Sequence, residues 1–307
     1  MTEDFRLLMI GAMYENGGNT THRFLDGHPD LAVYPFESQL GTRHVGDLLA
    51  SMFPLKYRWP EFLLGASAHD DYRAIIDEEC KVRARTPQVS RFRDRPFVFS
   101  DDDRRDRFVD LVAGAPRSRG RNVAAFFQAT FDVWRDHHAE TDRPIYVGYS
   151  PIVTVDYEKI LGDLPEARIL HVVRNPWSAY ADTCRRPVPL SLADYMLGWT
   201  TCQHAALVAA ARHPARVHVL RFEDLVADPA GTLTKVLATV GVAGAPALAY
   251  PTWNGHRLNE VYPWGTIRHA TVEANRSTAF ELSSAVRSDV TARAGLFLDA
   301  LDYRSFL

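Results

Sequence analysis

Residues 7–25 read LLMIGAMYENGGNTTHRFL, and this stretch decides the fold. Its opening run, Leu7–Ile10, is short and apolar without alternation, as is typical of a strand buried on both faces of a parallel sheet. A loop with Gly17 and Gly18 leads into a helix-like segment, a geometry that directs free backbone N–H groups at an anion on the helix start. The alternative is that the two glycines only turn the chain. Because the Gly-Lys-Ser/Thr ending of a Walker A loop is missing, ATP or GTP hydrolysis is not expected.

Three further apolar runs predict the rest of the sheet. Ile169–Val173 is as short and unbroken as the first run, whereas Val217–Leu220 and Ile145–Val147 are weaker strand signals. Most of these runs precede a helix-like segment, as βα units require. The sequence therefore predicts a three-layer α/β fold with a P-loop-like parallel sheet flanked by helices. Leu7–Ile10 and Ile169–Val173 are expected to be neighbouring inner strands whose C-terminal ends meet at one cleft.

Capping signals in the second half of the chain predict several helices. Asn175-Pro176 places an N-cap residue before a proline at the first helical position. Ser191–Asp194 has the pattern of a capping box, and Asp228-Pro229 starts a third helix. From about Ala279 to Leu301 the sequence predicts one long amphipathic helix that closes the domain.

Residues 55–145 differ in composition from the rest of the chain. They are richer in Arg, Asp and aromatic side chains, and strand signals are scarce among them. We therefore predict a mostly helical insertion within a single domain that spans residues 1–307. Because such insertions commonly carry specificity whereas the sheet carries the cofactor, we expect this one to recognise the substrate.

Composition and charge narrow the classes of function. Against 35 Lys and Arg the chain has 38 Asp and Glu, so no overall basic field indicates nucleic acid. Its three cysteines lack metal-binding spacing, which indicates free thiols in a reducing compartment and no metal centre. The acidic start differs from a signal peptide, and no stretch approaches the roughly 20 apolar residues of a membrane span. We expect a soluble cytoplasmic protein that does not bind membranes, and leave its oligomeric state open.

Three motifs follow the first helix in a fixed order. They are His28-Pro29-Asp30, then Arg174-Asn175-Pro176 after the second inner strand, then Arg221–Leu225 (RFEDL) with Asp228-Pro229 behind it. Together with the glycine loop, they resemble the "HPD", "RNP" and "RYEDL…DP" segments of bacterial and Golgi-type PAPS-dependent sulfotransferases. The resemblance covers most of the chain outside the predicted insertion.

The resemblance implies a site for PAPS as co-substrate. The family's loop binds the 5′-phosphosulfate, and the corresponding residues here are Asn16, Gly17, Gly18, Asn19 and Thr20. The arginine of the "RNP" turn binds the 3′-phosphate, and Arg174 has this position, where a guanidinium can grip phosphate through two parallel hydrogen bonds. Ser178 is expected to supply a hydroxyl nearby. Arg268 lies in residues 262–268 (YPWGTIR), where the family has a loop over the nucleotide, and is a further candidate phosphate ligand.

Glu37 is the expected general base. It lies in the segment YPFES, residues 34–38, where Golgi-type carbohydrate sulfotransferases carry their glutamate after the "HPD" turn. A carboxylate there would take the acceptor's proton during sulfuryl transfer. The alternative is that Glu37 is a solvated loop residue. His22 is a second catalytic candidate, and His28 the next.

Three positions depart from the family pattern. Glu15 or Asn16 stands where the loop normally has Lys or Arg, Tyr149 where many members have Lys, and Asp182 where a serine is usual. An unpaired carboxylate about 4 Å from a phosphate would be repelled by roughly 4 kcal/mol at an effective dielectric constant near 20, about a thousandfold in affinity. Either the two carboxylates turn away, or the ligand is not ordinary PAPS, or a cation pairs with them. The candidates for that cation are His22, Arg23, Arg185 and Arg186.

The leading hypothesis is a sulfotransferase that moves a sulfuryl group from PAPS to a hydroxyl or amine of a small molecule or carbohydrate. One alternative is an enzyme of the same fold with a different donor or reaction. Another is a non-catalytic binding protein that kept the fold. The sequence does not identify the acceptor, because a fold does not specify a substrate.

Overall fold

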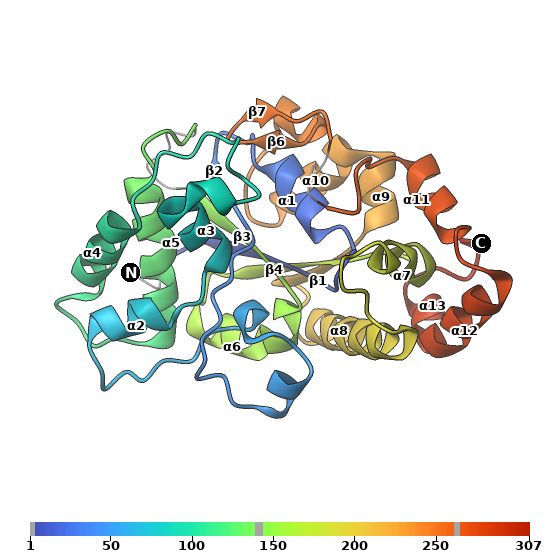
Figure 1. Ribbon diagram of the computed structural model, residues 1–307, viewed down its shortest axis with the longest axis horizontal. Helices are drawn as coiled ribbons and strands as arrows, with labels where there is room; N and C mark the ends of the chain where they lie inside the picture. The colour runs from blue at the N-terminus through green and yellow to red at the C-terminus, as the bar shows by residue number, and fades with distance from the viewer. Residues whose placement is uncertain (1–3, 139–143, 261–264) are drawn as a thin grey trace.

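A central sheet of five parallel strands organises the protein. The structure is a computed structural model that describes residues 4–138, 144–260 and 265–307. The strand order is β2-β3-β1-β4-β5 (Figure 1). The strands run over Leu7–Ala12 (β1), Leu31–Val33 (β2), Ile145–Pro151 (β3), Arg168–Val173 (β4) and Val217–Arg221 (β5).

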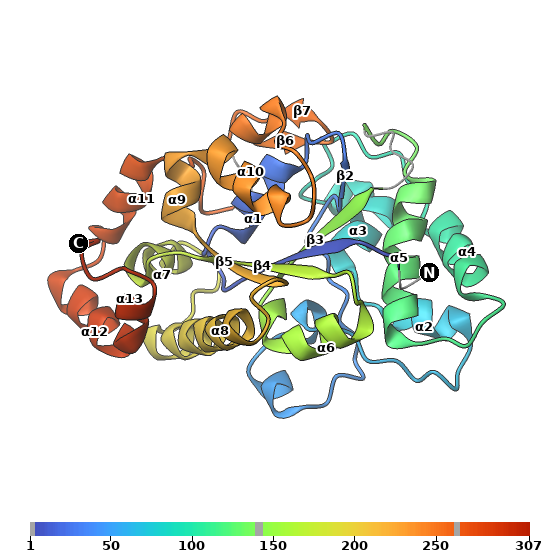
Figure 2. The same cartoon turned by 180° about the vertical axis from the view of Figure 1, so that it is seen from behind.

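Helices cover both faces of this sheet, which confirms the predicted three-layer α/β fold. Figures 1 and 2 show α1, α9 and α10 over one face and α6 and α8 over the other. The α-helices are α1 (Gly18–Leu25), α2 (Ala68–Ala74), α3 (Glu78–Arg85), α4 (Asp101–Val112), α5 (Arg119–Val133), α6 (Tyr157–Asp163), α7 (Pro176–Cys184), α8 (Leu192–Arg212), α9 (Phe222–Ala227), α10 (Pro229–Ala238), α11 (Val272–Ala279), α12 (Ser284–Ala294) and α13 (Leu296–Ala300). A small antiparallel pair, β6 (Thr252–Trp253) and β7 (His256–Arg257), lies apart from the main sheet.

The two strongest strand signals are neighbours in the sheet, as predicted. β1 lies between β3 and β4, and its Ile10 is in register with Leu170. Every residue of β1 is buried, which explains its unbroken apolar sequence. Because all the strands are parallel, the segments that follow β1, β3 and β4 leave the sheet at the same edge.

The three predicted helix starts are confirmed. The side chain of Asn175 accepts a hydrogen bond of 2.8 Å from the backbone N–H of Ser178, so α7 begins at Pro176. Ser191 caps α8 in the same way, and Asp228 caps α10. These caps satisfy N–H groups that have no partner within their own helix.

The prediction of one long C-terminal helix is wrong. The segment contains the end of α11, then α12 and α13 as separate helices. Ser283 caps the start of α12, and Gly295 ends it with φ of 38°, a backbone conformation that favours glycine. A periodic apolar pattern that continues across such a glycine does not make a continuous helix.

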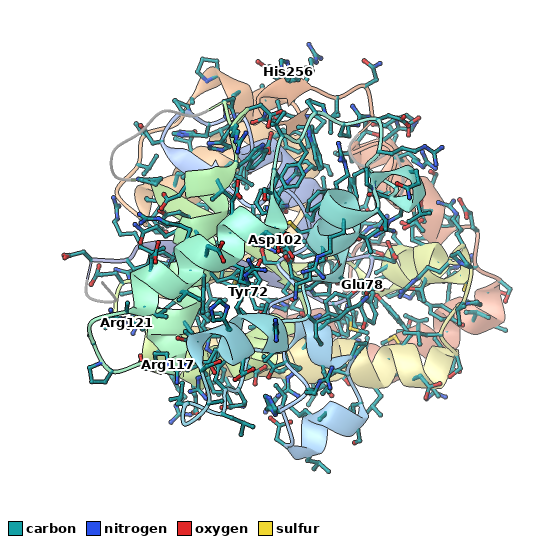
Figure 3. All side chains as sticks on the ribbon, turned by 60° about the vertical axis from the view of Figure 1, so that its left-hand side comes forward. Tyr72, Glu78, Asp102, Arg117, Arg121 and His256 are labelled. Atoms are coloured by element: carbon teal, nitrogen blue, oxygen red, sulfur yellow. The ribbon has the colours of Figure 1, made fainter. Side chains whose placement is uncertain are left out.

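Between residues 58 and 138 the α-helices of the described chain are α2, α3, α4 and α5, with a short 3-10 helix at Pro87–Val89. That this stretch is an insertion that recognises the substrate stays a prediction. Figure 3 views this side of the molecule, where Tyr72 of α2 donates a hydrogen bond of 2.5 Å to Asp101 of α4. The guanidinium of Arg104, fully buried, lies 2.7 Å from the carboxylate oxygens of both Asp77 and Asp101. Tyr34, which directly follows β2, donates to Asp77 at 2.7 Å. This buried charge cluster therefore fastens the helical insertion to the sheet.

The cysteines and the apolar character of the helices complete the description of the fold. Cys80, Cys184 and Cys202 are all free thiols, and only Cys184 is exposed. None of the helices in the described parts of the chain combines the length and the apolar character that a membrane span requires.

Candidate active site

The loop between β1 and α1 presents backbone donors at the C-terminal edge of the sheet. Gly17 has φ of 90° and is the N-cap of α1, and no described side chain caps this helix end. The first amides of a helix have no carbonyl partner within it, so those of Gly18, Asn19 and Thr20 are available to an anion. A small pocket of 40 Å³ lies there, lined in part by these four residues. We call it the loop pocket.

Asn16 holds this loop in place from behind. Its side-chain oxygen accepts hydrogen bonds from the backbone N–H of Arg174 at 2.9 Å and from the indole of Trp199 at 3.2 Å. Its amide nitrogen donates to the carbonyl of Tyr14 and to the hydroxyl of Tyr195. The Asn16 side chain is fully buried, so it faces the protein interior rather than the loop pocket.

The two loop glycines are required by close packing. A Cβ atom at Gly17 would lie 2.2 Å from the ring of Phe222, and one at Gly18 would lie 2.2 Å from the ring of Tyr149. Tyr149 takes the place where many family members have a lysine. Its ring packs against Gly18 at the start of α1, and a neutral phenol supplies no positive charge there.

Gly17→Ala is expected to destabilise the fold by about 2 kcal/mol, because it adds a strained positive φ to a steric clash. Urea denaturation measures this loss as a lower midpoint. Gly65→Ala is the matched control, since a Cβ there meets no atom within 4 Å. Equal midpoints for the two variants would contradict the packing argument.

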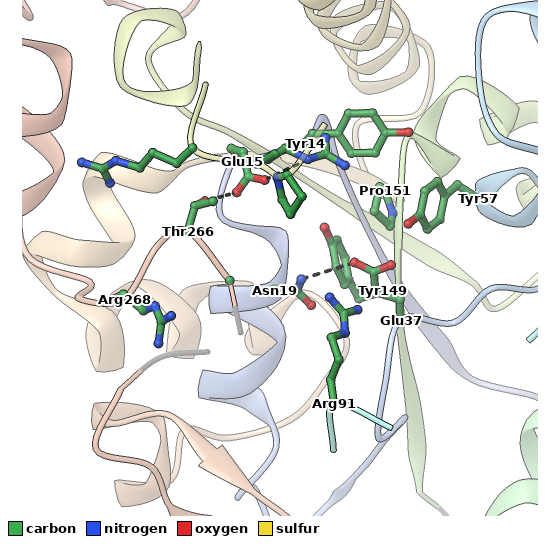
Figure 4. A pocket seen from close by; sticks show the side chains of 14 residues that line it. Tyr14, Glu15, Asn19, Glu37, Tyr57, Arg91, Tyr149, Pro151, Thr266 and Arg268 are labelled. Carbon is green, nitrogen blue, oxygen red and sulfur yellow. Dashed lines mark hydrogen bonds and ion pairs between the residues drawn. The ribbon is translucent and has the colours of Figure 1, made fainter. Parts of the chain in front are cut away.

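A larger cavity of 590 Å³ adjoins the loop pocket, and we call it the main cavity (Figure 4). The two share Glu15, Asn19, Tyr149, Gly265 and Thr266. Further residues that line the main cavity are Tyr14, Glu37, Tyr57, Arg91, Pro151, Arg185, Arg186, Pro187 and Arg268. Four guanidinium groups and two carboxylates therefore surround this space, which gives it a net positive lining.

Glu37 faces the main cavity beside the loop. The side-chain amide of Asn19, in the first turn of α1, donates to one carboxylate oxygen of Glu37 at 3.4 Å (Figure 4). Gln39 donates to the other oxygen at 3.5 Å. Burial and the nearby carboxylate of Glu37 raise the pKa of Tyr57, which keeps that phenol protonated as a possible donor. Glu37 is thus hydrogen-bonded to a residue in the first turn of α1.

Glu15 is paired at the mouth of the loop. Its carboxylate accepts a hydrogen bond from the Thr266 hydroxyl and lies 3.9 Å from the guanidinium of Arg186 (Figure 4). Burial raises the pKa of Glu15, and the bond from Thr266 and the charge of Arg186 oppose that rise. Glu15 therefore pairs with a cation, and that cation is Arg186, one of the four candidates named from the sequence.

Asp182 is paired as well, and one of its partners is Arg174. Arg174 donates to Asp182 at 2.5 Å, to the carbonyl of Glu15 at 3.1 Å and to the side-chain oxygen of Asn275 at 2.6 Å. The second oxygen of Asp182 accepts from Arg185 at 2.6 Å. A third pocket of 280 Å³, which we call the Arg174 pocket, is lined by both Arg174 and Asp182.

The other predicted site residues occupy different surroundings. Arg268 lines both the main cavity and the Arg174 pocket and pairs with Glu260 at 2.7 Å. Ser178 is buried, and its hydroxyl donates to the carbonyl of Asn275 at 2.7 Å. Within the stretch 262–268, residues 262–264 lie outside the described residues.

The two histidine candidates lie apart from the main cavity lining. His22 belongs to α1 and is 1% exposed, and burial and the charge of Arg23 hold its pKa well below the ordinary value. His28 is equally buried, and its ring lies 2.9 Å from the carbonyl of Ala243. Their catalytic roles stay predictions.

Several lining residues were not singled out from the sequence. Arg91 comes from the insertion, where no motif marks it. Asn275, a hydrogen-bond partner of Arg174 and not a lining residue, comes from α11, 101 residues after Arg174. Thr266 lies two residues before Arg268, inside the stretch already expected to cover the nucleotide. Gly265 lies in the same stretch, so its position offered the same signal for two cavity residues.

The fold and this site together define an α/β transferase whose first helix offers its N-terminus to an anion. A sequence profile described as the sulfotransferase family matches residues 9–246, and the chain belongs to that family. The predicted assignment to sulfotransferases, and to enzymes, is therefore confirmed. No curated protein sequence matches the chain significantly.

Two solved structures have a similar fold. The sulfotransferase domain of the Synechococcus PCC 7002 olefin synthase is 18% identical, with a TM-score of 0.52 over 96% of this chain and 95% of that one. The sulfotransferase domain from the curacin biosynthetic pathway is 14% identical, with a TM-score of 0.54 over 98% and 99%. At these identities the likeness extends to the fold alone.

The residues present fit PAPS at one end only. A phosphosulfate group fits the amides of α1, and it also meets the guanidinium groups of the main cavity, each of which already pairs with a carboxylate. A 3′-phosphate finds Arg174 already bound through two of its nitrogens, and the hydroxyl of Ser178 already donating to a carbonyl. Asp182 adds a negative charge at that end.

Proposed function

We propose that this protein transfers a sulfuryl group from a nucleotide 5′-phosphosulfate to a hydroxyl or amine of a small-molecule or carbohydrate acceptor. PAPS is the family's donor and the first candidate. The observation that carries the proposal is the hydrogen bond between Asn19 and Glu37. It links the start of α1, where the phosphosulfate of the donor would bind, to the carboxylate of Glu37. The sulfuryl donor and the proton acceptor would therefore lie next to each other in one cavity.

The chemistry needs no covalent bond to the protein. The acceptor oxygen or nitrogen forms a bond to sulfur while the bond from sulfur to the bridging phosphate oxygen breaks, and the nucleotide phosphate keeps that electron pair. Glu37 takes the proton that the acceptor loses. The amides of Gly18 and Asn19, with Arg186 nearby, stabilise the charge that develops on the leaving phosphate.

The acceptor is proposed to enter from the side of the helical insertion. Tyr57 and Arg91 line the main cavity and also a neighbouring pocket of 250 Å³ bordered by Glu79 and Phe92. Glu79 pairs with Arg91 and accepts a hydrogen bond from the backbone of Glu37 at 3.3 Å. The insertion within a single domain of residues 1–307 therefore reaches the proposed base, which is consistent with its expected role in recognition.

A second candidate function is transfer from a donor other than PAPS on the same fold. The Arg174–Asp182 ion pair favours it, because it occupies the groups expected to hold the 3′-phosphate. A cytoplasmic location stays a prediction, supported by the three free thiols.

The test is a transfer assay with radiolabelled PAPS and radiolabelled adenosine 5′-phosphosulfate (APS), each supplied with a panel of hydroxyl and amine acceptors. Label is expected to appear in at least one acceptor. Absence of transfer from both donors, together with no binding of either product nucleotide, would contradict the proposed function.

A further inference from the structure

One wall of the Arg174 pocket is formed by charged side chains of both signs. The Arg174 and Asp182 side chains are each 2% exposed and are held together at 2.5 Å. Asp182 also pairs with Arg185, and Arg185 pairs with Glu281. Positive and negative groups therefore alternate along this wall. The charge of Arg174 is compensated inside the protein.

Arg268 also lines this pocket, and the group within it that opposes a phosphate is Asp182. A phosphate monoester carries nearly two negative charges at neutral pH. Two unit charges about 4 Å apart at an effective dielectric constant near 20 repel enough to lower affinity about a thousandfold. To bind Nη1 of Arg174, a phosphate would have to displace Asp182, which would leave a buried carboxylate without that partner.

The same wall suits a hydroxyl. A carboxylate accepts a hydrogen bond from a sugar hydroxyl but has no donor for a phosphate. Dinucleotide-binding domains use this difference, since an acidic residue selects the ribose hydroxyl of NAD whereas an arginine accommodates the phosphate of NADP. Asp182 is the corresponding acidic residue in the Arg174 pocket, where it would favour a ribose hydroxyl over a phosphate.

The pocket is continuous with the proposed reaction site. Thr266 lines the loop pocket, the main cavity and the Arg174 pocket alike. A nucleotide whose phosphosulfate lies on the start of α1 would therefore pass Thr266 and reach Asp182 with its sugar. Glu15, also bound to Thr266, lowers the positive charge along the same path.

We propose that Asp182 makes this protein select a nucleoside 5′-phosphosulfate with a free ribose hydroxyl, such as APS, over its 3′-phosphorylated form. This inference rests on the proposed function and specifies its donor. Asp182 acts as the specificity-determining residue, because it both occupies Arg174 and repels a second phosphate.

Titration calorimetry with the two product nucleotides tests the inference. The wild-type protein is expected to bind 5′-AMP at least about tenfold more tightly than 3′,5′-ADP. Asp182→Ser, which frees Arg174 and Arg185 for a phosphate, is expected to shift this ratio about a hundredfold toward 3′,5′-ADP. Asp289→Ser is the matched control, because that aspartate forms an exposed pair with Arg293 and should leave the ratio unchanged.

The outcomes separate the inference from the proposed function. Tighter wild-type binding of 3′,5′-ADP overturns the inference and leaves the sulfotransferase proposal intact. No wild-type binding of either nucleotide overturns both. If Asp182→Ser does not fold, Asp182→Asn replaces it, and the wild-type ratio alone still decides between the two donors.

Discussion

Glu37→Gln is expected to lower the rate of sulfuryl transfer about 10²–10⁴-fold while donor binding is unchanged. Glutamine keeps the shape of the side chain and still accepts the hydrogen bond from Asn19 that the structure places at 3.4 Å. It cannot take the acceptor's proton, so only the chemical step is affected. Single-turnover rates and calorimetry of the product nucleotide measure the two effects separately.

The control for this variant is Glu158→Gln, an exposed carboxylate paired with Arg212 on another part of the surface. Loss of donor binding in Glu37→Gln would mean that Glu37 organises the loop instead of accepting a proton. Unchanged turnover would place the base elsewhere. His22 and His28 would then be the next residues to replace, although both are buried.

Arg104→Met is expected to reduce the free energy of unfolding by about 3–5 kcal/mol, because it leaves two buried carboxylates without their cation. The Arg104 side chain has no exposed surface, and both Asp77 and Asp101 lie 2.7 Å from its guanidinium. Urea denaturation measures the loss. Arg105→Met is the control on the same helix, since Arg105 pairs only with partly exposed carboxylates in the described chain.

The pH dependence gives this prediction a second readout. Burial alone would raise the pKa of Asp101, but the charge of Arg104 and the hydrogen bond from Tyr72 hold it at about 2. The pKa of an aspartate in an unfolded chain is about 3.9. The stability from Asp101 is thus complete above that value and is lost as the pH falls toward 2, and Arg104→Met should weaken this dependence. An unchanged urea midpoint in Arg104→Met would contradict the role of the cluster.

Local signals in the sequence were enough to predict four of the five strands of the sheet and three helix starts, whereas β2 (Leu31–Val33) was not predicted. The apolar runs at β1 and β4 indicated buried parallel strands because a strand covered on both faces has no polar side to display. Asn175, Ser191 and Asp228 indicated helix starts because a cap bonds an amide only two or three residues away. The same approach failed near Gly295, where the positive φ of one residue separates α12 from α13.

The candidate site was predicted only in part, and the pairing of its charges lay beyond the sequence. Motif order placed Glu37, Asn19 and Arg268 among the cavity residues, but it did not indicate that Ser178 donates to Asn275 or that Asn16 points inward. Those side-chain directions depend on partners from distant elements.

The sequence by itself determined the family, the strand–loop–helix unit and the presence of carboxylates at unexpected positions. Only the tertiary structure decided what those carboxylates do. Asp182 lies two turns into α7, whereas Arg174 precedes that helix at the end of β4, and they meet because Arg174 folds back over the helix start between Glu15 and Asn275. Pairing of charges is set by distance and burial in three dimensions. Residue identity and spacing alone therefore left open whether Arg174 was available to a ligand.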